Sequence, residues 1–553
     1  MLPPLLSALG LAIVAAVAGV ADARSTTGGF RKGLGFREPQ LRKHHAAVKG
    51  AQEPPARRQY DEFPEQWFEQ PLDHFNNETG DTFLQRYWFS KRHYTPGAGG
   101  PVIVLDGGET SGEGRLPFLD TGIVEILTRA TGGVGVILEH RYYGETQPVQ
   151  NLTTDSLRFL NNDQSAADSA YFMANVKFDG IDEDLTAPGT PWIYYGGSYA
   201  GARSAHMRVL YPDLVYGAIA SSGVTHAIIE DWEYMETIRK AAPANCSLGL
   251  ENSIQTIDSV LTEGGSAADD LKALFGLAGL EHNDDFGNVL RNPVFNWQSK
   301  CWNDECGDDS FDQFCAALTK EPGNSVIAGA VYGHPSRSVN ITDSLTVDYV
   351  LQNYANYINQ AGSSFTYAAG CAGHVEQCFG SYNDTDYQGT GLDQDWRLWQ
   401  FQVCTQWGFF NVPPPDPDQP RIISSFITLE SESKICKQAY APGEYFTVPA
   451  EPNITAVNAL GGYDIAADRL AIIDGEVDPW RPDTPHSLDA KPRDDTTIRP
   501  FKLIPGAVHH YDEYGLADIS QEPPEILQIH EEMIAFVTEW LKEWNQTTTK
   551  STS

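Results

Sequence analysis

Positive charge is scarce in this chain, and long apolar runs are absent after its first residues. The 553 residues include 38 Lys and Arg against 74 Asp and Glu, which gives a formal net charge of −36. So acidic a surface repels nucleic acid and anionic lipid, and we expect neither as a partner. After residue 23 no apolar stretch approaches the roughly 20 residues that cross a bilayer, and the tail 546–553 is polar. The sequence therefore predicts a protein that works outside membranes.

The sequence also lacks the motifs that bind metals and phosphates. Its eight cysteines include no C-x-x-C pair, which argues against a zinc site. Gly107-Gly108-Glu109 follows a predicted strand, but it has neither the lysine nor the spacing of a phosphate-binding loop. Among so many acids, carboxylate pairs occur by chance, so nothing marks a glycosidase site. We expect no metal and no cofactor.

The first 23 residues have the features of an export signal without a basic start. They contain no Lys or Arg, include the apolar run 9–20 and end in Ala21-Asp22-Ala23. An ending with two small residues around a third is typical of a cleavage site, so we predict a signal peptide over 1–23. The missing basic residues leave a membrane anchor as the alternative, although the apolar run is short for a span.

The segment 24–58 has the opposite charge to the chain that follows it. It holds nine Arg or Lys against two acids and ends in Ala56-Arg57-Arg58, whereas the residues after it include 29 bases and 71 acids, a formal charge of −42. This contrast predicts a basic propeptide that is removed after the two arginines, so that the mature protein begins near Gln59. A basic leader that stays attached is the alternative.

Cysteines and glycosylation motifs point to the secretory route. An even number of cysteines confined to one region of an exported protein predicts four disulfides; they are Cys246, Cys301, Cys306, Cys315, Cys371, Cys378, Cys404 and Cys436. Seven N-x-S/T motifs predict glycosylated surface, at Asn77, Asn151, Asn245, Asn340, Asn383, Asn453 and Asn545. We therefore expect a secreted, extracellular glycoprotein, with the vacuole or lysosome as the alternative location.

The segment 192–201, WIYYGGSYAG, carries the strongest chemical signal. An apolar, aromatic run ends in Ser198 between small residues, and the helix-competent stretch 202–211 follows. This layout predicts a nucleophile elbow, a sharp strand-to-helix turn that exposes the serine hydroxyl. Small neighbours are needed because the strained backbone passes close to the next strand. The usual pattern is G-x-S-x-G, whereas position 200 is alanine and Gly201 comes one residue late.

Two later strand ends supply an acid and a base, which a serine needs to become a nucleophile. The predicted strand 469–474 is followed by Asp478, and the predicted strand 498–505 is followed by His509 and His510. We favour Asp478 over Asp474 because Asp478 lies in a loop, from which its carboxylate can reach the candidate base at the neighbouring strand end. His486, in a polar loop, and His530, in an amphipathic helix, are less suited to be the base. The residues themselves do not distinguish His509 from His510.

The predicted strands surround this candidate site. Strands are expected at 82–90, 101–105, 134–139 and 216–221, with helical segments between them. Alternating strands and helices predict a largely parallel sheet that is covered on both faces. The first turn of such a sheet and the residue after the nucleophile commonly supply oxyanion-hole donors. We therefore predict an oxyanion hole formed at Gly108 and by the N–H of Tyr199.

A long insertion divides the predicted sheet. Residues 226–460 are too many for a loop, and they contain all eight cysteines and helix-like segments such as 253–275. We interpret the insertion as a disulfide-stapled helical cap on an α/β-hydrolase fold, whose two parts are 59–225 and 461–545. The amphipathic segment 524–544 is predicted to form a helix that packs on the sheet.

Five short motifs, in order along the chain, resemble one family of serine peptidases. They are QPLDHF (70–75), EHRYYG (139–144), the serine block 192–201, VDPW (477–480) and GAVHH (506–510). With them the chain resembles the family of lysosomal Pro-Xaa carboxypeptidase and dipeptidyl-peptidase II, which includes secreted prolyl peptidases of fungi. The likeness extends from about residue 66 to 540. Close relatives often carry glycine where this chain has Ala200, and alanine is still small.

The resemblance implies a role for each candidate residue. Ser198 is the nucleophile, Asp478 the orienting acid, and His509, the first histidine of the pair, the base. Trp480 is expected to stack on a substrate proline, with packing beneath the cap as the alternative. The implied reaction is hydrolysis on the carboxyl side of proline in peptide or protein substrates, with removal of terminal residues (as a Pro-Xaa carboxypeptidase or a dipeptidyl-peptidase) favoured over endopeptidase action. A carboxylic-ester hydrolase and a catalytically silent binding glycoprotein are the other interpretations.

Overall fold

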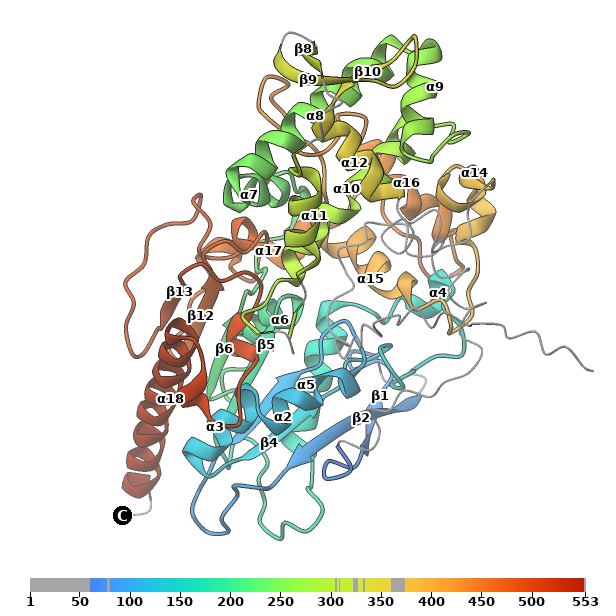
Figure 1. Cartoon of the computed structure of the whole chain (residues 1–553). Helices are drawn as coiled ribbons and strands as arrows, with labels where there is room; N and C mark the ends of the chain where they lie inside the picture. Colours follow the sequence, from blue (N-terminus) through green and yellow to red (C-terminus); the bar gives the residue numbers. More distant parts are fainter. Residues whose placement is uncertain are drawn as a thin grey trace, which may run out of the picture.

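The computed structural model describes residues 60–76, 80–303, 306–307, 309–321, 327–331, 334–359 and 373–551. The predicted signal peptide and basic leader lie outside the described residues, as do Asn77 and Cys371. Figure 1 shows a lower part built around a sheet and an upper part built mainly of helices, with the C-terminal helix along one side of the sheet.

The central sheet of the described chain has eight strands in the order β1-β2-β4-β3-β5-β6-β12-β13. They are β1 (Gln66–Pro71), β2 (Thr82–Ser90), β3 (Val102–Asp106), β4 (Val134–Leu138), β5 (Trp192–Gly197), β6 (Gly217–Ser221), β12 (Leu470–Gly475) and β13 (Phe501–Ile504). Strand β2 runs antiparallel to both of its neighbours, and the strands from β4 to β13 run parallel to one another. A parallel sheet with a serine on its strand-to-helix turn is an α/β-hydrolase fold, and the predicted fold class is confirmed.

Helices cover both faces of the sheet (Figure 1). Helices α2 (Leu116–Asp120), α3 (Ile123–Thr131) and α18 (Pro524–Ser551) share an apolar core with alternate strand residues such as Ile103. Helices α5 (Asn162–Asn175) and α6 (Tyr199–Leu210) share a second core with the residues between them, such as Val104. Because both faces are buried, the inner strands are apolar throughout.

Some predicted boundaries differ from those in the structure. The segment predicted as strand 498–505 forms strand only over β13, because Pro500 and Pro505 flank it and proline has no N–H to donate to the ladder. The edge strand β1 was not predicted. Helix α18 continues beyond the predicted end at residue 544, as far as Ser551.

The insertion between β6 and β12 is mainly helical and lies above the sheet in Figure 1. Its described helices are α7 (Glu233–Ala241), α8 (Ala244–Glu263), α9 (Gly265–Leu274), α10 (Asn283–Phe295), α11 (Ser310–Leu318), α12 (Tyr349–Asn359), α14 (Val375–Phe379), α15 (Trp396–Gln402), α16 (Leu429–Ala439) and α17 (Ile454–Asn458). The single helix expected over 253–275 is two helices, because Gly264 and Gly265 both have φ near +70° and break the helix between α8 and α9.

Two small sheets that the sequence did not predict also lie in the insertion. Strand β7 (Ile228–Glu230) pairs in parallel with β11 (Gly408–Phe410). Strands β8 (Ile327–Val331), β9 (His334–Asn340) and β10 (Thr346–Asp348) form an antiparallel sheet. Because β7 stands at the start of the insertion and β11 in its second half, the first of these sheets ties these two parts of the insertion together.

Three disulfides between described cysteines connect parts of the insertion. Cys246–Cys315 joins α8 to α11, Cys301–Cys306 closes a short loop, and Cys404–Cys436 joins the helical segment 403–407 to α16. Cys378 is also disulfide-bonded. The apolar core beneath α3 and α18 continues into the helices of the insertion, so the cap and the sheet share a core.

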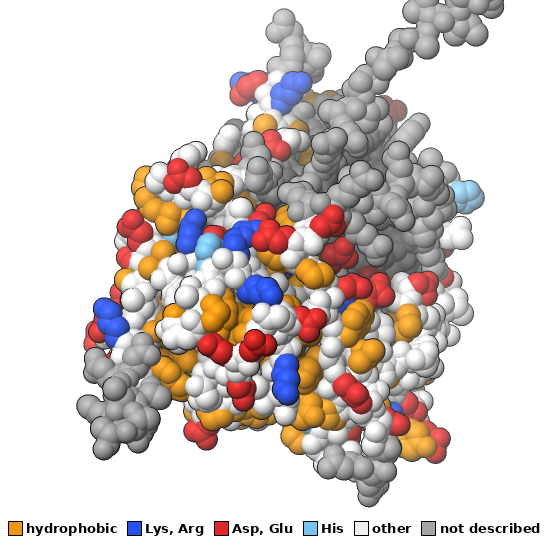
Figure 2. Space-filling model, turned by 90° about the horizontal axis from the view of Figure 1, so that it is seen from below, with side chains coloured by type: hydrophobic (Ala, Val, Ile, Leu, Met, Phe, Trp, Pro, Cys, Tyr) orange, Lys and Arg blue, Asp and Glu red, His pale blue; other side chains and the backbone are white. Residues whose placement is uncertain are grey.

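The surface carries the excess of negative charge in a dispersed form. Figure 2 shows the molecule from below, where Asp and Glu side chains are interspersed with fewer Lys and Arg and with small apolar patches. Among the described residues, no helix combines the length and the apolar character needed to cross a membrane.

Candidate active site

Ser198 lies at the turn between β5 and α6, where its backbone has φ 60° and ψ −124°. A non-glycine residue at this φ is strained, as expected of a nucleophile elbow. Its N–H donates to Ser221 O on the neighbouring strand β6 at 2.9 Å. A Cβ on Gly201 would lie 2.6 Å from the same oxygen, which explains why the required glycine stands at 201. The Cβ of Ala200 points to the first turn, 3.3 Å from the place of a Cβ on Gly108, and fits there.

Asp478 and His509 meet at the ends of β12 and β13. The His509 Nδ1 atom lies 2.8 Å from Asp478 Oδ2 and 3.0 Å from Oδ1, and both side chains are buried. The two loops also bond directly, since Val477 N–H donates to Ala507 O at 3.0 Å. Their close approach requires Gly475, where a Cβ would lie 2.0 Å from Val508 O.

The neighbouring histidine has a different partner. His510 Nδ1 lies 3.1 Å from Glu513 Oε2, and the backbone N–H of His510 donates to Ser222 Oγ at 2.9 Å. Glu513 in turn approaches the elbow so closely that a Cβ on Gly197 would lie 2.2 Å from its Oε1. The loop that carries His509 therefore packs against Gly197, which precedes Ser198, and against Ser222, which follows the neighbouring strand β6.

The other acid and histidines considered from the sequence occupy separate sites. Asp474 Oδ2 lies 2.6 Å from His486 Nδ1, and the His486 ring stacks on Phe501 with centroids 3.6 Å apart. His530 is fully buried in α18 and pairs with Glu522 at 2.7 Å. The structure thus brings Asp478 together with His509, and it brings Asp474 together with a histidine of another loop.

Burial lowers the pKa of His509 below the ordinary imidazole value, and the charge of neighbouring His510 acts in the same direction, although Asp478 opposes both. A lowered pKa keeps the ring neutral into the acidic range. Neutral imidazole is the form that accepts a proton from a serine hydroxyl.

The first turn after β3 lies beside the elbow, but its Gly108 amide has a partner. The Gly108 N–H donates to Asp106 Oδ1 at 2.9 Å. Asp106 Oδ2 accepts from Arg203 Nε at 2.7 Å and from Tyr194 OH at 2.6 Å. Burial raises the pKa of Asp106, but the charge of Arg203, the nearby His140 and the hydrogen bonds from Tyr194 and Gly108 together lower it by more, so the net shift is downward. The Gly108 N–H therefore has a carboxylate partner in this structure, and its role as an oxyanion donor stays a prediction.

Aromatic rings extend from the acid loop to the elbow. The half-buried Trp480 packs edge-on against Tyr234 and Phe409, each with centroids 5.1 Å apart. Tyr199, next to Ser198, packs against Trp399 and Trp407 at 5.2 and 5.4 Å. Tyr199, Trp407 and Phe409 belong to one apolar cluster, and Trp399 and Trp480 pack against it. The cap therefore supplies an aromatic wall beside the candidate nucleophile.

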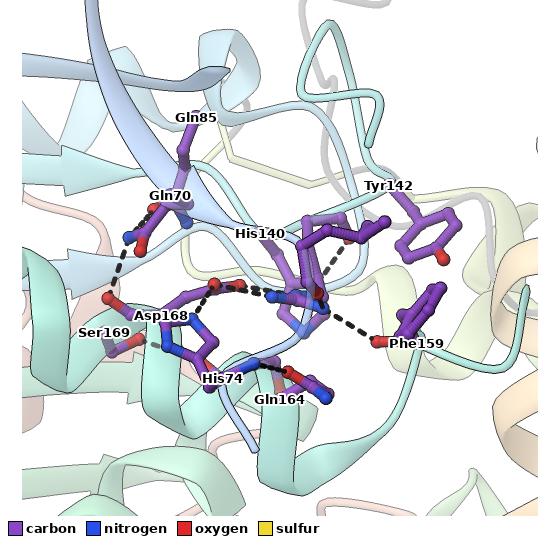
Figure 3. A network of polar contacts seen from close by, with 12 residues as sticks. Gln70, His74, Gln85, His140, Tyr142, Phe159, Gln164, Asp168 and Ser169 are labelled. Atoms are coloured by element: carbon purple, nitrogen blue, oxygen red, sulfur yellow. Dashed lines mark hydrogen bonds and ion pairs between the residues drawn. The ribbon is translucent and has the colours of Figure 1, made fainter. Parts of the chain in front are cut away.

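The motifs QPLDHF and EHRYYG, far apart in the sequence, meet around Asp168 of α5 (Figure 3). Asp168 Oδ1 lies 2.7 Å from both His74 Nε2 and Arg141 Nη2, and Gln70 Nε2 donates to its backbone oxygen at 2.9 Å. His140 Nε2 contacts Tyr199 OH at 3.2 Å. Through the contact of His140 with Tyr199, this buried network packs against the elbow. No motif in the sequence marks Asp168 as its centre, and likewise none marks Asp106, Arg203 or Glu513.

The described glycosylation motifs are accessible. Five of the seven predicted asparagines have exposed side chains, namely Asn151, Asn245, Asn340, Asn383 and Asn453. Asn545 lies in α18. In the described part of the chain, no group of three or more His, Cys, Asp or Glu side chains is arranged to hold a metal ion.

Comparison with known proteins connects this geometry to a family. The model of the family "Serine carboxypeptidase S28" matches residues 70–534. A probable extracellular serine carboxypeptidase of Arthroderma benhamiae is 40% identical over 506 residues, covering 87% of this chain and 68% of its own. Serine protease vicPa of Bipolaris victoriae is 28% identical (86% and 89% covered), as is the thymus-specific serine protease of Mus musculus (86% and 87%).

Solved structures are more distant. Proline iminopeptidase of Mycobacterium smegmatis is 13% identical with a TM-score of 0.30, covering 87% of this chain and 100% of its own, so the fold is assigned from the strand order and the elbow instead. The family match spans most of the chain and confirms the resemblance seen in the five motifs. The chain therefore belongs to the serine carboxypeptidase S28 family and is a serine-type peptidase.

Proposed function

We propose that this peptidase is secreted and hydrolyses peptide bonds on the carboxyl side of proline, with Ser198 as nucleophile, His509 as base and Asp478 as orienting acid. The observation that carries the proposal is the contact of His509 Nδ1 with Asp478 Oδ2 at 2.8 Å, on a loop that packs against Gly197, the residue before a serine with φ 60°. An elbow serine next to an acid–histidine pair is the arrangement that acyl-enzyme chemistry requires.

The proposed reaction assigns a role to each of these groups. Ser198 Oγ attacks the carbonyl carbon while its proton passes to His509 Nε2, the ring nitrogen opposite the one that contacts Asp478. The N–H of Tyr199, the first of helix α6, stabilises the negative charge on the carbonyl oxygen. When the C–N bond breaks, His509 returns the proton to the leaving amine. A water molecule deprotonated by His509 then hydrolyses the acyl-enzyme and restores Ser198.

Proline specificity is supported by the aromatic wall. Proline has no N–H and a compact, fixed ring, so a site that selects it needs apolar surface rather than hydrogen bonds. The half-buried Trp480 lies two residues after Asp478 and packs with Tyr234 and Phe409. We propose that its free surface stacks on the pyrrolidine ring of the substrate.

An exopeptidase mode and secretion are supported by the relatives. The family description and the name of the Arthroderma protein both say carboxypeptidase, and the latter says extracellular. Disulfides and exposed N-x-S/T motifs are typical of secreted proteins. A dipeptidyl-peptidase mode is the alternative within exopeptidases.

Labelling and product mapping test the proposal together. Wild type and Ser198→Ala are exposed to a fluorophosphonate probe, and wild type is then given peptides that differ only in Pro or Ala before the scissile bond. We expect labelling of wild type alone, and release of terminal residues from the proline peptide. Ser204→Ala is the matched control, since Ser204 is a buried serine of the same helix whose hydroxyl donates to backbone oxygens of β5 and β6.

The outcomes separate the alternatives. Probe labelling of Ser198→Ala would refute the nucleophile, and equal cleavage after Ala and Pro would refute the specificity. Hydrolysis of simple carboxylic esters without peptide cleavage would instead identify an ester hydrolase. Products from inside a long peptide would refute the exopeptidase mode.

A further inference from the structure

Two tryptophans of the cap reach down to the loops that carry the proposed acid and base. Trp297, in the short helix η3 (Asn296–Ser299), donates its indole N–H to Val477 O at 2.9 Å. Trp302 donates its indole N–H to Tyr511 O, also at 2.9 Å. Val477 immediately precedes Asp478, and Tyr511 follows the His509-His510 pair by one residue. One short cap segment thus contacts both loops.

The residue after Trp297 contacts the proposed proline pocket. Gln298 is buried, and its Oε1 atom accepts hydrogen bonds from Trp480 Nε1 at 2.9 Å and from Tyr234 OH at 2.8 Å. An indole N–H can only donate, so the amide must present its oxygen to Trp480. Gln298 therefore fixes the orientation of the Trp480 ring relative to the cap.

The cap segment is itself firmly anchored. Trp297 packs edge-on against Phe311 of α11, with centroids 5.0 Å apart. Helix α11 is joined to α8 by the disulfide Cys246–Cys315. Trp302 lies inside the loop closed by the disulfide Cys301–Cys306. Trp297 and Tyr511 also belong to the apolar core that the cap shares with the sheet, so the anchor and the loops form one packed unit.

We propose that Trp297, Gln298 and Trp302 are positioning residues of this peptidase, which together we call the cap clamp. Trp297 and Trp302 hold the acid and base loops in register with each other, and Gln298 holds Trp480 at the angle that selects proline. The inference rests on the proposed function, because it assigns these residues to the same reaction.

The chemistry explains why such a clamp matters. The Asp478–His509 contact joins two loops that follow separate strands, so a shift of either loop moves the base relative to Ser198. Misplacement of a reacting group by about 1 Å can lower a rate by roughly 100-fold. Loss of the Trp297 or Trp302 bond would therefore reduce kcat and leave KM nearly unchanged, whereas loss of the Gln298 bonds would change KM and the preference for proline.

Matched tryptophan variants test the first part. Trp297→Phe and Trp302→Phe remove the indole N–H and keep an aromatic ring. Trp192→Phe and Trp540→Phe are the controls, because these indoles also donate to backbone oxygens, of Leu185 at 2.8 Å and Thr497 at 2.7 Å, but in the sheet and in α18. Melting temperature, kcat, KM and the acid limb of the pH–rate profile are measured for all four on a proline peptide.

We expect all four variants to lose similar amounts of melting temperature, and the two cap variants alone to lose about tenfold or more in kcat and to shift the acid limb. If Trp297→Phe and Trp302→Phe match the two controls in kcat and in pH profile, the clamp is refuted. A cap variant that fails to fold is replaced by Trp297→His or Trp302→His, which retains a ring N–H and should recover activity.

Gln298→Met and Gln298→Glu test the second part. Methionine fills a similar volume but offers only a weak sulfur acceptor, so proline selectivity should fall several-fold. The carboxylate oxygens of glutamate can accept both hydrogen bonds and should restore it. Equal selectivity in both variants would refute the role of Gln298. The proposed function is tested by different measurements. It predicts that Ser198→Ala is inactive and that wild type cleaves after proline, and both results are independent of the cap variants.

Discussion

Two adjacent histidines have different partners, and their substitutions should have different effects. His509 contacts Asp478, whereas His510 contacts Glu513. We expect His509→Ala to lower kcat/KM by several orders of magnitude, as loss of a triad member does, and His510→Ala to lower it far less. Steady-state kinetics of both purified variants, with circular dichroism to verify folding, provide the measurement. Equal losses would leave the base unassigned.

In the proposed mechanism, the lowered pKa of His509 sets the acid limit of the enzyme. Burial favours the neutral ring, and this effect prevails over the attraction of Asp478 for the charged form. Because the neutral ring is the proposed base, we expect activity to persist as the pH falls below the ordinary imidazole value of about 6.5. We therefore expect an acidic working range. A profile of kcat/KM against pH checks this, and a maximum above about pH 8 would contradict it.

Trp480 should determine the preference for proline. Trp480→Ala removes one apolar contact with the pyrrolidine ring, and such a contact contributes roughly 1–3 kcal/mol of discrimination. We expect KM for proline peptides to rise and the Pro-to-Ala ratio of kcat/KM to fall about tenfold or more. Paired Pro and Ala peptides give the ratio directly. An unchanged ratio would assign Trp480 to packing alone.

The sequence identified the residue types of the candidate site but not all of their partners. Ser198 and the loop acid stand out because strand-end patterns are visible locally. The choice between His509 and His510 depends on which imidazole faces Asp478, and that is a property of the folded loops. The pairing of Asp474 with His486 was hidden for the same reason.

At the scale of elements, one buried ion pair joins β3 to the elbow helix α6. Arg203 Nε lies 2.7 Å from Asp106 Oδ2, and both side chains are almost fully buried. Arg203→Met would leave the Asp106 carboxylate without its counter-charge, and we expect it to reduce the free energy of unfolding by roughly 3–5 kcal/mol. Urea unfolding measures the loss. The double variant Asp106→Asn/Arg203→Met removes both charges and should recover part of it; no recovery would indicate that the charge pairing is not responsible.

Strands were predictable from the sequence where burial on both faces of the sheet determined which residues they contain. The strands β3, β4, β6 and β12 were located to within a residue or so, because continuous apolar runs are required in a sheet that is buried on both faces. Strand β2 was located as well, although it contains Gln85 and Arg86. Strand β1 escaped prediction because it is an edge strand with polar positions such as Gln66 and Glu69. The short strands β7 and β11 depend on each other across the insertion, which no local pattern reveals.

At the scale of the whole molecule, buried acids next to the acid loop link stability to pH. Burial raises the pKa of Asp231 to about 7, and burial together with Asp231 and Glu233 raises the pKa of Asp483 well above its ordinary value. A carboxyl with a raised folded-state pKa stabilises the fold fully below its unfolded value of about 3.9, and this contribution is lost as the pH rises toward about 7.

Asp483→Asn tests this linkage, since the amide stays neutral at every pH. We expect the variant to match wild type at pH 4 and to melt about 2 °C or more higher at pH 8, because it lacks one of the two acids whose ionisation destabilises the wild type as the pH rises. Calorimetry at both pH values gives the difference. A variant that is less stable than wild type at pH 8 would show that the Asp483 carboxylate is needed in its charged form.

The division into sheet and cap was predictable from the length of the insertion and from the confinement of cysteines to it. The disulfide pairs were not, because eight cysteines permit 105 pairings and Cys246 meets Cys315 only through the packing of α8 on α11. The shared core of cap and sheet could not be predicted from the sequence either. Trp297 and Val508 lie in that one core, but no local pattern around either residue indicates that they pack together.

The insertion has a consequence for the timing of synthesis. Strands β6 and β12 are neighbours in the sheet, yet β6 ends at Ser221 and β12 begins at Leu470. At roughly 5–20 residues per second, Ser198 leaves the ribosome about 14–56 s before Asp478. Throughout that interval the nascent chain has the proposed nucleophile without acid or base, and β6 has a free edge. The order of the elements along the chain therefore postpones the proposed proteolytic competence until Asp478 and His509 have been synthesised.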